Sequence, residues 1–264
     1  MASATESTKE KFMTENKLSV IIPAKNENFG IKVCLELIAL YVDNLLEIIV
    51  IVESADDQTI KVIDTVNLNE QINLRVVFNE FSKGVTGSIQ TGIKMASGNY
   101  VFIYPADEIN PIFALNDFTK KLDSGFDLVS ATRYSKGGLR LGVGSFSGNF
   151  LSRLVATLAL FVTNGRFSDL STGIKAFKKD VIEVPVKPFS QNGWSFPMEI
   201  ELRALLGGKK ISEIPIISVD RPFGGESSYH ATSWILSYSK VIIKVLFLKL
   251  KSRARLKQLK GLRK

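Results

Sequence analysis

The sequence predicts an α/β fold in which helices flank a mainly parallel sheet. Two observations favour this class. Short apolar runs alternate with amphipathic segments through the first half of the chain, and a polar cluster follows most of the runs. The apolar runs predict strands at 18–23, 46–52, 74–78, 100–104 and 126–133, and the amphipathic segments predict helices at 29–42, 59–66 and 86–96.

The strands of the first half are recognised by their nearly unbroken apolar character. Residues 18–23 (LSVIIP) and 46–52 (LEIIVIV) have few polar interruptions, which is typical of strands buried on both faces of a parallel sheet. The segment between them, 29–42, repeats apolar residues at helical spacing. The later strands and helices of this half follow the same alternation, which is the order expected for βαβ units.

The second half of the chain is less regular. Five glycines between 137 and 148 indicate a mobile loop. Beyond it we expect a helix at about 149–161, a turn at 168–173, a helix at 197–206 that begins with proline, and a final strand at 210–218. The apolar segment 149–162 is too short to cross a bilayer, and it suits either internal packing or a membrane surface.

Composition limits the chemistry that the chain can perform. Its 264 residues are 45% hydrophobic, enough for one large α/β domain or for one domain with an appendage. The single Cys34 and the single His230 exclude a disulfide framework and a site built from several Cys or His ligands. A bound metal would therefore take oxygen ligands, as Mg²⁺ or Mn²⁺ does.

Positive charge is concentrated at the C-terminal end. The net charge is +8, and residues 240–264 are rich in Lys and Arg without one Asp or Glu. A basic amphipathic terminus favours peripheral contact with an anionic membrane. Nucleic acid is the competing partner, but the tail has no aromatic residue after Phe247, so we expect no nucleic-acid binding.

Three parts are expected along the chain. Residues 1–17 are polar and predicted to be disordered, 18–230 are expected to form one α/β domain, and 231–264 are expected to form a basic amphipathic tail that associates with membranes. No secretory signal and no uninterrupted apolar run of about 18 residues is visible. The expected location is therefore cytoplasmic, peripheral on the cytosolic face of a membrane.

Polar clusters follow four of the predicted strands, at 23–27, 53–59, 79–84 and 105–111. Ligands of open α/β sheets bind at the carboxyl ends of the strands, so these clusters are expected to share one crevice. The last cluster contains Asp107 and Glu108, which are well placed to hold a divalent cation against a phosphorylated substrate. A polar junction between strand and loop is the simpler interpretation of that pair taken alone.

Five segments together resemble the family 2 glycosyltransferases of the GT-A fold, close to the dolichyl- or polyprenyl-phosphate sugar synthases. They are SVIIPAKNE at 19–27, KGVTGSIQTGIKMASGNYVFIYPADE at 83–108, SATRYSKGG at 130–138, DLSTGIKAFKKDVI at 169–182 and EIELRALLGGKKISEIPIISVDRPFGGESS at 199–228. The resemblance covers about 18–228 and implies a Rossmann-like, mainly parallel sheet. It also implies an inverting transfer of sugar from a nucleotide-diphosphate sugar to a polyprenyl phosphate.

The resemblance also implies a donor site at the strand ends. Its nucleotide-binding residues are Pro23, Ala24, Asn26, Glu27 and Glu53, and its diphosphate-binding residues are Lys83, Gly84, Arg221 and Ser227. The usual Asp-Asp-Gly-Ser after the second strand is replaced here, so Asp56 or Asp57 is expected to cap the following helix.

Asp107 resembles the second acid of the family's Asp-x-Asp metal motif, and Pro105 stands where the first acid is expected. Glu108 could supply the missing oxygen. Alternatively, Mg²⁺ or Mn²⁺ could be held by Asp107, donor phosphates and water, or the dependence on metal could be weakened. The metal ligands implied by the resemblance are therefore Asp107 and Glu108.

Arg133 resembles the arginine that meets the acceptor phosphate, a task that suits the bidentate guanidinium. A second arginine of the family is absent; Arg140 and Lys136 could compensate for it or could be ordinary solvated charges. The stretch that resembles the floor of the acceptor and sugar site contains Asp169, Ser171, Thr172, Gly173 and Lys175.

The nature of the acceptor decides the chemistry. A lipid phosphate already carries an anionic nucleophile and needs no general base, with Arg133 positioning it and Asp107, Lys83 and Arg221 stabilising the departing diphosphate. A hydroxyl acceptor of a glycan or small molecule would need a base, for which Glu199 and Glu201 are candidates. A sugar-phosphate nucleotidyltransferase is a rival of another class, but 19–27 lacks the glycine-rich loop followed by Arg and Lys that such enzymes carry.

Overall fold

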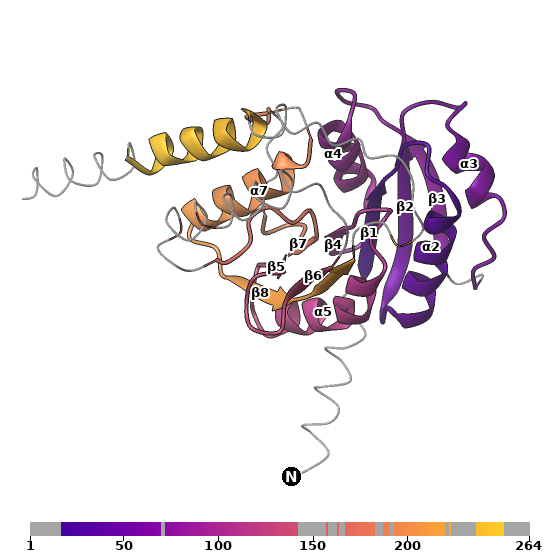
Figure 1. The fold of residues 1–264 in the computed structure, drawn as a ribbon, viewed down its shortest axis with the longest axis horizontal. Coiled ribbons are helices and arrows are strands. Elements are labelled where there is room, and N and C mark those ends of the chain that lie inside the picture. The colour runs from indigo at the N-terminus through magenta and orange to yellow at the C-terminus, as the bar shows by residue number, and fades with distance from the viewer. Residues whose placement is uncertain are drawn as a thin grey trace, which may run out of the picture.

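The computed structural model describes residues 17–69, 72–141, 157, 163, 167–182, 187–190, 193–219, 222 and 236–250. Seven strands form the main sheet in the order β3-β2-β1-β4-β7-β5-β8, and β6 and β9 form a separate two-stranded sheet (Figure 1). The strands are β1 (Leu18–Pro23), β2 (Leu45–Val52), β3 (Asn73–Phe78), β4 (Tyr100–Ile103), β5 (Leu128–Thr132), β6 (Leu139–Leu141), β7 (Lys175–Lys178), β8 (Ile211–Pro215) and β9 (Ile217–Val219). The helices are α2 (Phe29–Tyr41), α3 (Gln58–Ile63), α4 (Val85–Met95), the 3-10 helix η1 (Asn110–Ala114), α5 (Leu115–Asp123) and α7 (Ser195–Leu206).

The predicted α/β fold is confirmed. Strands β3, β2, β1 and β4 pair in parallel, and all of the strands and helices expected in the first half are present with small shifts at their ends. The apolar runs of β1 and β4 are buried at every position, as expected for strands covered on both faces.

Alternate side chains of each strand enter two different cores. Val20 and Ile22 of β1 pack with α2 and α5 on one face of the sheet, whereas Ile21 packs with α4 and α7 on the other. Figure 1 shows these helices on the two sides of the sheet. The sheet is therefore a middle layer that holds the carboxyl ends of its parallel strands along one edge.

Strand β7 was not predicted, and it is the one antiparallel member of the main sheet. It lies between β4 and β5, with Ile103 and Ser130 both facing Lys175 in the register. Because β7 runs against its neighbours, its first residue lies at the carboxyl edge of the sheet. The segment just before β7, which the sequence indicated only as a turn, is thereby brought to that edge.

The predicted strand at 210–218 was wrong as a single element. β8 pairs with β5 up to Pro215, and β9 then pairs with β6. Ile216 is the point of exchange, since its N–H donates to the carbonyl of Thr132 at 2.9 Å and its carbonyl accepts from the N–H of Leu139 at 2.9 Å. The chain thus changes partner strand within one residue.

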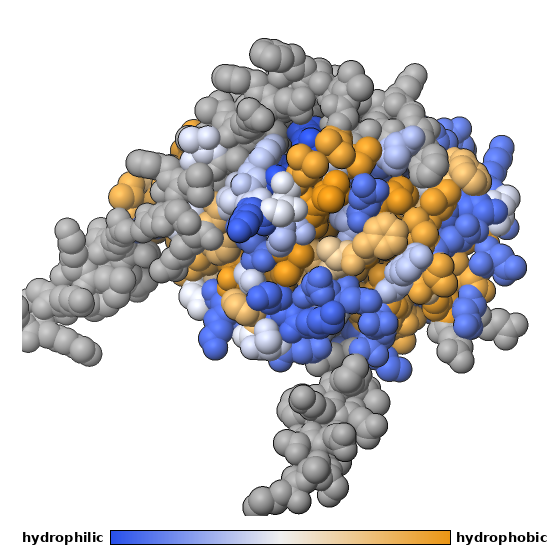
Figure 2. Space-filling model, turned by 60° about the horizontal axis from the view of Figure 1, so that its bottom comes forward, coloured by the Kyte–Doolittle hydropathy of each residue, from blue (hydrophilic) through white to orange (hydrophobic). Residues whose placement is uncertain are grey.

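Helices η1 and α5 were also not predicted. Pro111 lies in the first turn of η1, where a missing N–H costs nothing. In α5, Leu115, Phe118 and Leu122 are buried at helical spacing beneath a polar outer surface. Figure 2 shows a side of the molecule on which hydrophobic residues are exposed among hydrophilic ones.

Residues 236–250 are helical and pack beside α7. Tyr238, Val241, Ile242 and Val245 are buried in a third core with Met198 and other α7 and loop residues. In the described part of the chain, no helix has the length and apolar character needed to cross a bilayer. Apart from residue 157, the helix expected at 149–161 lies outside the described residues.

Candidate functional site

The loops after β1 and β2 are bonded to each other. The N–H of Asn26 donates to Asp57 Oδ1 at 2.9 Å, and the N–H of Glu27 donates to Thr59 Oγ1 at 2.8 Å. Asp57 also accepts from the N–H of Thr59 and caps α3, as expected for one of the two aspartates. The sequence-predicted residues Pro23 to Glu27 therefore lie against the second strand end.

Glu53 connects the second strand end to the third. Its Oε1 accepts from Asn79 Nδ2 at 3.0 Å and from the N–H of Gly84 at 2.8 Å. Gly84 is the N-terminal cap of α4 and has a φ of +97°, a conformation that favours glycine. These bonds fix the loop that presents Lys83 and Gly84, the two residues expected near the donor diphosphate.

Asp107 and Glu108 follow β4 at the same edge of the sheet. The Sγ of Cys34 lies 3.8 Å from the carbonyl oxygen of Glu108. Burial raises the pKa of this thiol, and the charges of Asp107, Glu27 and Glu108 raise it further. The carboxylates that follow β1 and β4 thus act on the same buried thiol.

The fourth strand end also contacts the small sheet. Glu108 Oε1 accepts from Ser218 Oγ of β9 at 2.7 Å, and Arg140 of β6 lies opposite Ser218 in the register. Among the described residues, no group of three or more His, Cys, Asp or Glu side chains is placed to hold a metal. The acids present fit a cation that takes one carboxylate from Asp107 and its other ligands from phosphate and water.

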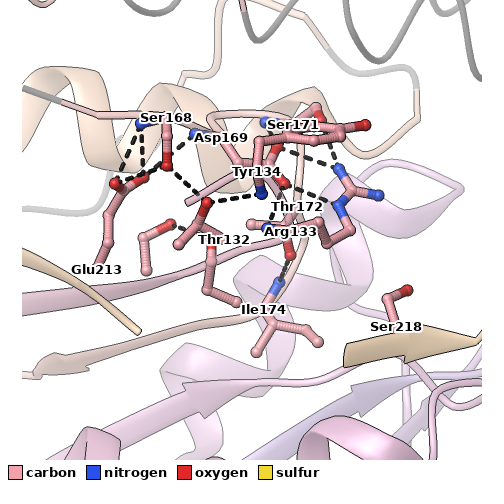
Figure 3. A network of polar contacts seen from close by, with 12 residues as sticks. Thr132, Arg133, Tyr134, Ser168, Asp169, Ser171, Thr172, Ile174, Glu213 and Ser218 are labelled. Carbon is pink, nitrogen blue, oxygen red and sulfur yellow. Dashed lines mark hydrogen bonds and ion pairs between the residues drawn. The ribbon is translucent and has the colours of Figure 1, made fainter. Parts of the chain in front are cut away.

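Arg133 and Asp169 form a bidentate ion pair at the site (Figure 3). The guanidinium donates from Nε to Asp169 Oδ2 at 2.7 Å and from Nη2 to Oδ1 at 3.1 Å, and Nη2 also donates to Ser171 Oγ at 2.6 Å. The side chain of Asp169 is fully buried and that of Arg133 is 11% exposed. Such a bidentate pair fixes both the position and the plane of the guanidinium.

The charges of this pair stabilise each other. Burial alone would raise the pKa of Asp169, but the Arg133 charge and the hydrogen bonds from Arg133 and Ser171 hold it below its usual value. Burial likewise opposes the charge of Arg133, yet Asp169 raises its pKa above the usual value. Both groups are therefore ionised at neutral pH, and a charge-balanced ion pair with a fixed guanidinium stands at the end of β5.

Glu213 is a second acid that supports this pair through hydrogen bonds. Glu213 of β8 accepts from the N–H and the Oγ of Ser168, each at 2.9 Å, and from the N–H of Asp169 at 3.2 Å. The Oγ of Ser168 lies 2.6 Å from Thr132 Oγ1 at the end of β5. Figure 3 shows this chain of contacts running from Glu213 to Arg133.

Gly173 leaves room for an aromatic ring. A Cβ atom at this position would lie 2.4 Å from Cε3 of Trp194, the residue that precedes α7. The absence of a side chain is therefore a packing requirement of the site, because the tryptophan ring occupies that space.

Lys175, Glu199 and Glu201 are all buried and paired. Lys175 donates to Glu201 and, at 2.7 Å, to Ser130 Oγ, and the side chains of Lys175 and Glu201 have no exposed surface. Glu199 accepts from Arg203 Nε at 2.8 Å and from the N–H of Phe189 at 2.7 Å. Burial raises the pKa of Glu199 despite these partners. The two glutamates considered as bases are thus enclosed by the fold.

Sequence reasoning missed the residues that support the site: Thr132, Ser168, Trp194, Glu213 and Ser218. Four of them are small or polar residues that show no periodic signal, and their roles depend on which strands become neighbours. The arrangement of 168–175 could have been suspected from its Ser, Thr and Gly cluster, but its position required the direction of β7. Arg221 and Ser227 lie outside the described residues.

Known proteins resemble this chain in both sequence and fold. The dolichol-phosphate mannosyltransferase of Pyrococcus furiosus is 29% identical over 215 residues, which cover 75% of this chain and 55% of the relative. This chain thus spans about half the length of that relative. The dolichyl-phosphate hexose transferase of Haloferax volcanii is 25% identical over 232 residues, which cover 88% of this chain and 95% of the relative.

A solved structure supports the assignment of the fold. The glucosyl-3-phosphoglycerate synthase from Mycobacterium tuberculosis, in complex with Mn²⁺, UDP-glucose and phosphoglyceric acid, superposes with a TM-score of 0.64. It is 21% identical, and the superposition covers 90% of this chain and 80% of that one. The fold is of the GT-A type, as the sequence suggested.

The model of the glycosyl transferase family 2 matches residues 19–184. The match runs from β1 to just beyond β7, so it contains the strand ends at which the described site residues gather. Because it spans more than half of the chain, this protein belongs to glycosyl transferase family 2 and is a glycosyltransferase.

Proposed function

We propose that the protein transfers a sugar from a nucleotide-diphosphate sugar to a polyprenyl phosphate at a membrane surface, with inversion at the anomeric carbon. The names of the two dolichyl-phosphate relatives support this acceptor class. The observation that carries the proposal is the apolar outer face of the small sheet, because Gly138, the residue before β6, packs against the backbone of the phosphate-binding candidate Arg133.

The small sheet has two different faces. Ser218 turns toward Glu108 on the inner side, whereas Leu139, Leu141 and Ile217 are 46%, 47% and 45% exposed. Neighbouring residues of a strand point to opposite faces, so these three side chains share the outer face. An exposed apolar strip next to a guanidinium of fixed orientation suits an acceptor with a phosphate head and an isoprenoid chain.

The donor would lie across the loops after β1, β2 and β3. Pro23, Ala24, Asn26, Glu27 and Glu53 are proposed to hold the nucleotide, while Lys83, Gly84, Arg221 and Ser227 are proposed to contact the diphosphate. Asp107, with or without Glu108, would hold Mg²⁺ or Mn²⁺, which when bound offsets negative charge on the leaving diphosphate.

The transfer requires no general base in this proposal. Arg133 holds the acceptor phosphate, whose oxygen forms a bond to the anomeric carbon as the bond from that carbon to the diphosphate breaks. The enclosure of Glu199 and Glu201 favours this acceptor over a hydroxyl, since neither glutamate reaches solvent. The basic tail and its helix are proposed to keep the enzyme at the cytosolic face of an anionic membrane.

The test is a transfer assay with radiolabelled UDP-, GDP- and CMP-sugars, polyprenyl phosphate and Mn²⁺. We expect product in the lipid phase from one donor, loss of most activity on chelation, and a greater loss in Asp107→Ala than in Glu108→Ala. Phosphoglycerate and free sugars serve as hydroxyl acceptors. Transfer to one of these with none to lipid phosphate would overturn the proposal.

The apolar strip makes a second prediction. Leu139→Ser combined with Leu141→Ser should raise the KM for a long-chain polyprenyl phosphate about tenfold, because each change exposes the chain to a polar contact in place of an apolar one. The KM for a short-chain phosphate and for the donor should stay unchanged. Leu40→Ser is a matched control, since Leu40 is 73% exposed near the C-terminal end of α2. Equal KM changes for long and short chains would contradict the role of the strip.

A further inference from the structure

One tyrosine of the C-terminal helix reaches the candidate site directly. Tyr238 is 3% exposed, and its hydroxyl lies 3.2 Å from the carbonyl oxygen of Ser171 and 3.1 Å from that of Trp194. The hydroxyl has one proton, which it shares between these two acceptors. The helix at 236–250 is thereby bonded to the segment before β7 and to the start of α7.

Both carbonyls belong to residues that shape the site. Ser171 accepts from Arg133 Nη2 and donates to Asp169 Oδ1 at 2.7 Å. Trp194 packs its ring into the space left by Gly173. A shift of Tyr238 would therefore move Ser171, which bonds to the guanidinium of Arg133, and Trp194, which packs against Gly173.

A second contact fixes the orientation of the helix. The Nζ of Lys244 lies 5.0 Å from the centre of the Phe189 ring, and Arg203 of α7 lies 4.1 Å from the same centre. The N–H of Phe189 donates to Glu199 of α7. Tyr238 and Lys244 thus contact the rest of the protein at two points of the helix. A movement of the helix would therefore also move α7 and the segment that contains Ser171.

The outer face of this helix is apolar and bordered by positive charge. Leu236, Ile243, Phe247 and Leu250 are between 64% and 70% exposed, and their spacing places them in one stripe. Lys240 lies beside the stripe, and residues 231–264 contain no Asp or Glu. Apolar side chains flanked by lysines fit the boundary between the headgroups and acyl chains of an anionic bilayer.

We propose that Tyr238 is a positioning residue that couples the docking of this stripe on an anionic bilayer to the geometry of Arg133 and Asp169. The inference rests on the proposed function, in which the acceptor phosphate lies in the membrane and Arg133 receives it. Docking of the helix stabilises the arrangement in which Ser171 orients the guanidinium. The enzyme thereby binds its acceptor most tightly when it is docked on the membrane that contains the acceptor.

Tryptophan fluorescence tests the coupling without a measurement of activity. In a Trp234→Phe background, Trp194 is the one tryptophan of the chain, and its fluorescence should shift when phosphatidylglycerol vesicles are added. The shift should be absent with phosphatidylcholine vesicles and in Phe247→Ser, and it should be strongly reduced in Tyr238→Phe. Tyr100→Phe is the matched control. Tyr100 is the first residue of β4, at the end of the strand away from the site, and its hydroxyl bonds to Asp123 at 2.8 Å.

The kinetic test separates positioning from stability. With phosphatidylglycerol vesicles, Tyr238→Phe should bind vesicles like the unchanged protein but show about a fivefold higher KM for the lipid phosphate, the effect of one neutral hydrogen bond. Its kcat and its KM for the donor should be unchanged, as should all constants of Tyr100→Phe. A melting temperature of Tyr238→Phe close to that of Tyr100→Phe would exclude general destabilisation as the cause.

The outcomes distinguish this inference from the proposed function. A fluorescence shift that depends on Tyr238, without transfer to lipid phosphate, would support the coupling and overturn the acceptor. Transfer to lipid phosphate with identical behaviour of Tyr238→Phe and Tyr100→Phe would support the acceptor and overturn the coupling. If anionic vesicles left the fluorescence of Trp194 unchanged, the coupling would also be overturned.

Discussion

Asp169→Asn is expected to lower kcat/KM by about 10²- to 10³-fold, comparable to the removal of a preorganised charge-stabilising group. The substitution removes the charge that balances Arg133 and replaces one of the two accepting oxygens with an NH2 group, which cannot accept from the guanidinium. The loss of a charge partner for a largely buried arginine should also cost about 3 kcal/mol of unfolding free energy. Steady-state kinetics and denaturant unfolding measure the two effects separately.

Ser171→Ala is the control for this prediction. It removes one hydrogen bond to Arg133 at 2.6 Å while the bidentate contact with Asp169 remains. The loss of kcat/KM should therefore be smaller, about tenfold. If Asp169→Asn had the same KM for the acceptor as the unchanged protein, Arg133 would not need a fixed orientation. The proposal that Arg133 holds the acceptor phosphate would then have to be rejected.

Glu201→Met is expected to destabilise the protein by about 3–5 kcal/mol, because it leaves the Lys175 ammonium buried without its partner. Both side chains have no exposed surface, so water cannot replace the lost contact. The double variant Lys175→Met/Glu201→Met should recover most of the lost stability, since an apolar pair of similar volume suits this interior. Denaturant unfolding of both variants gives the free energies, and the midpoint and slope should be reported together.

An exposed ion pair provides the contrast. Lys120 and Asp117 are 2.9 Å apart on the surface of α5, with side chains 73% and 57% exposed. Lys120→Ala should change the free energy of unfolding by no more than about 0.5 kcal/mol. Should Glu201→Met cost as little as Lys120→Ala, the lysine beneath the site would have another partner or would be neutral in the fold.

The sequence predicted the parallel half of the sheet well because its signals are local. Each of β1, β2 and β4 is an apolar run in which burial on both faces is visible from the residues alone. The position of Glu53 and of Asp107 at strand ends followed directly from those runs. The capping role of Asp57 was likewise readable from a residue type and its place before a helix.

The supports of Arg133 could not be predicted in the same way. β7 is four residues long and reads Lys-Ala-Phe-Lys, which resembles an exposed segment, yet Lys175 is buried. Its burial depends on Glu201, a residue 26 positions away on another element. The partners of Asp169 also come from distant parts of the chain, so they become visible only once β7 and β8 are placed. The η1 and α5 helices were different, since the spacing of Leu115, Phe118 and Leu122 was present in the sequence.

The antiparallel strand β7 also has a consequence for synthesis on the ribosome. β4 and β5 are made before β7, but neither pairs with the other; each needs β7 as its neighbour. The edge of β4 therefore stays open until residues 175–178 have emerged, and β5 has no neighbour in the sheet before then. An open strand edge is a site of mispairing between chains. The interval between the emergence of β4 and that of β7 is thus a stage at which the nascent chain is exposed to such mispairing.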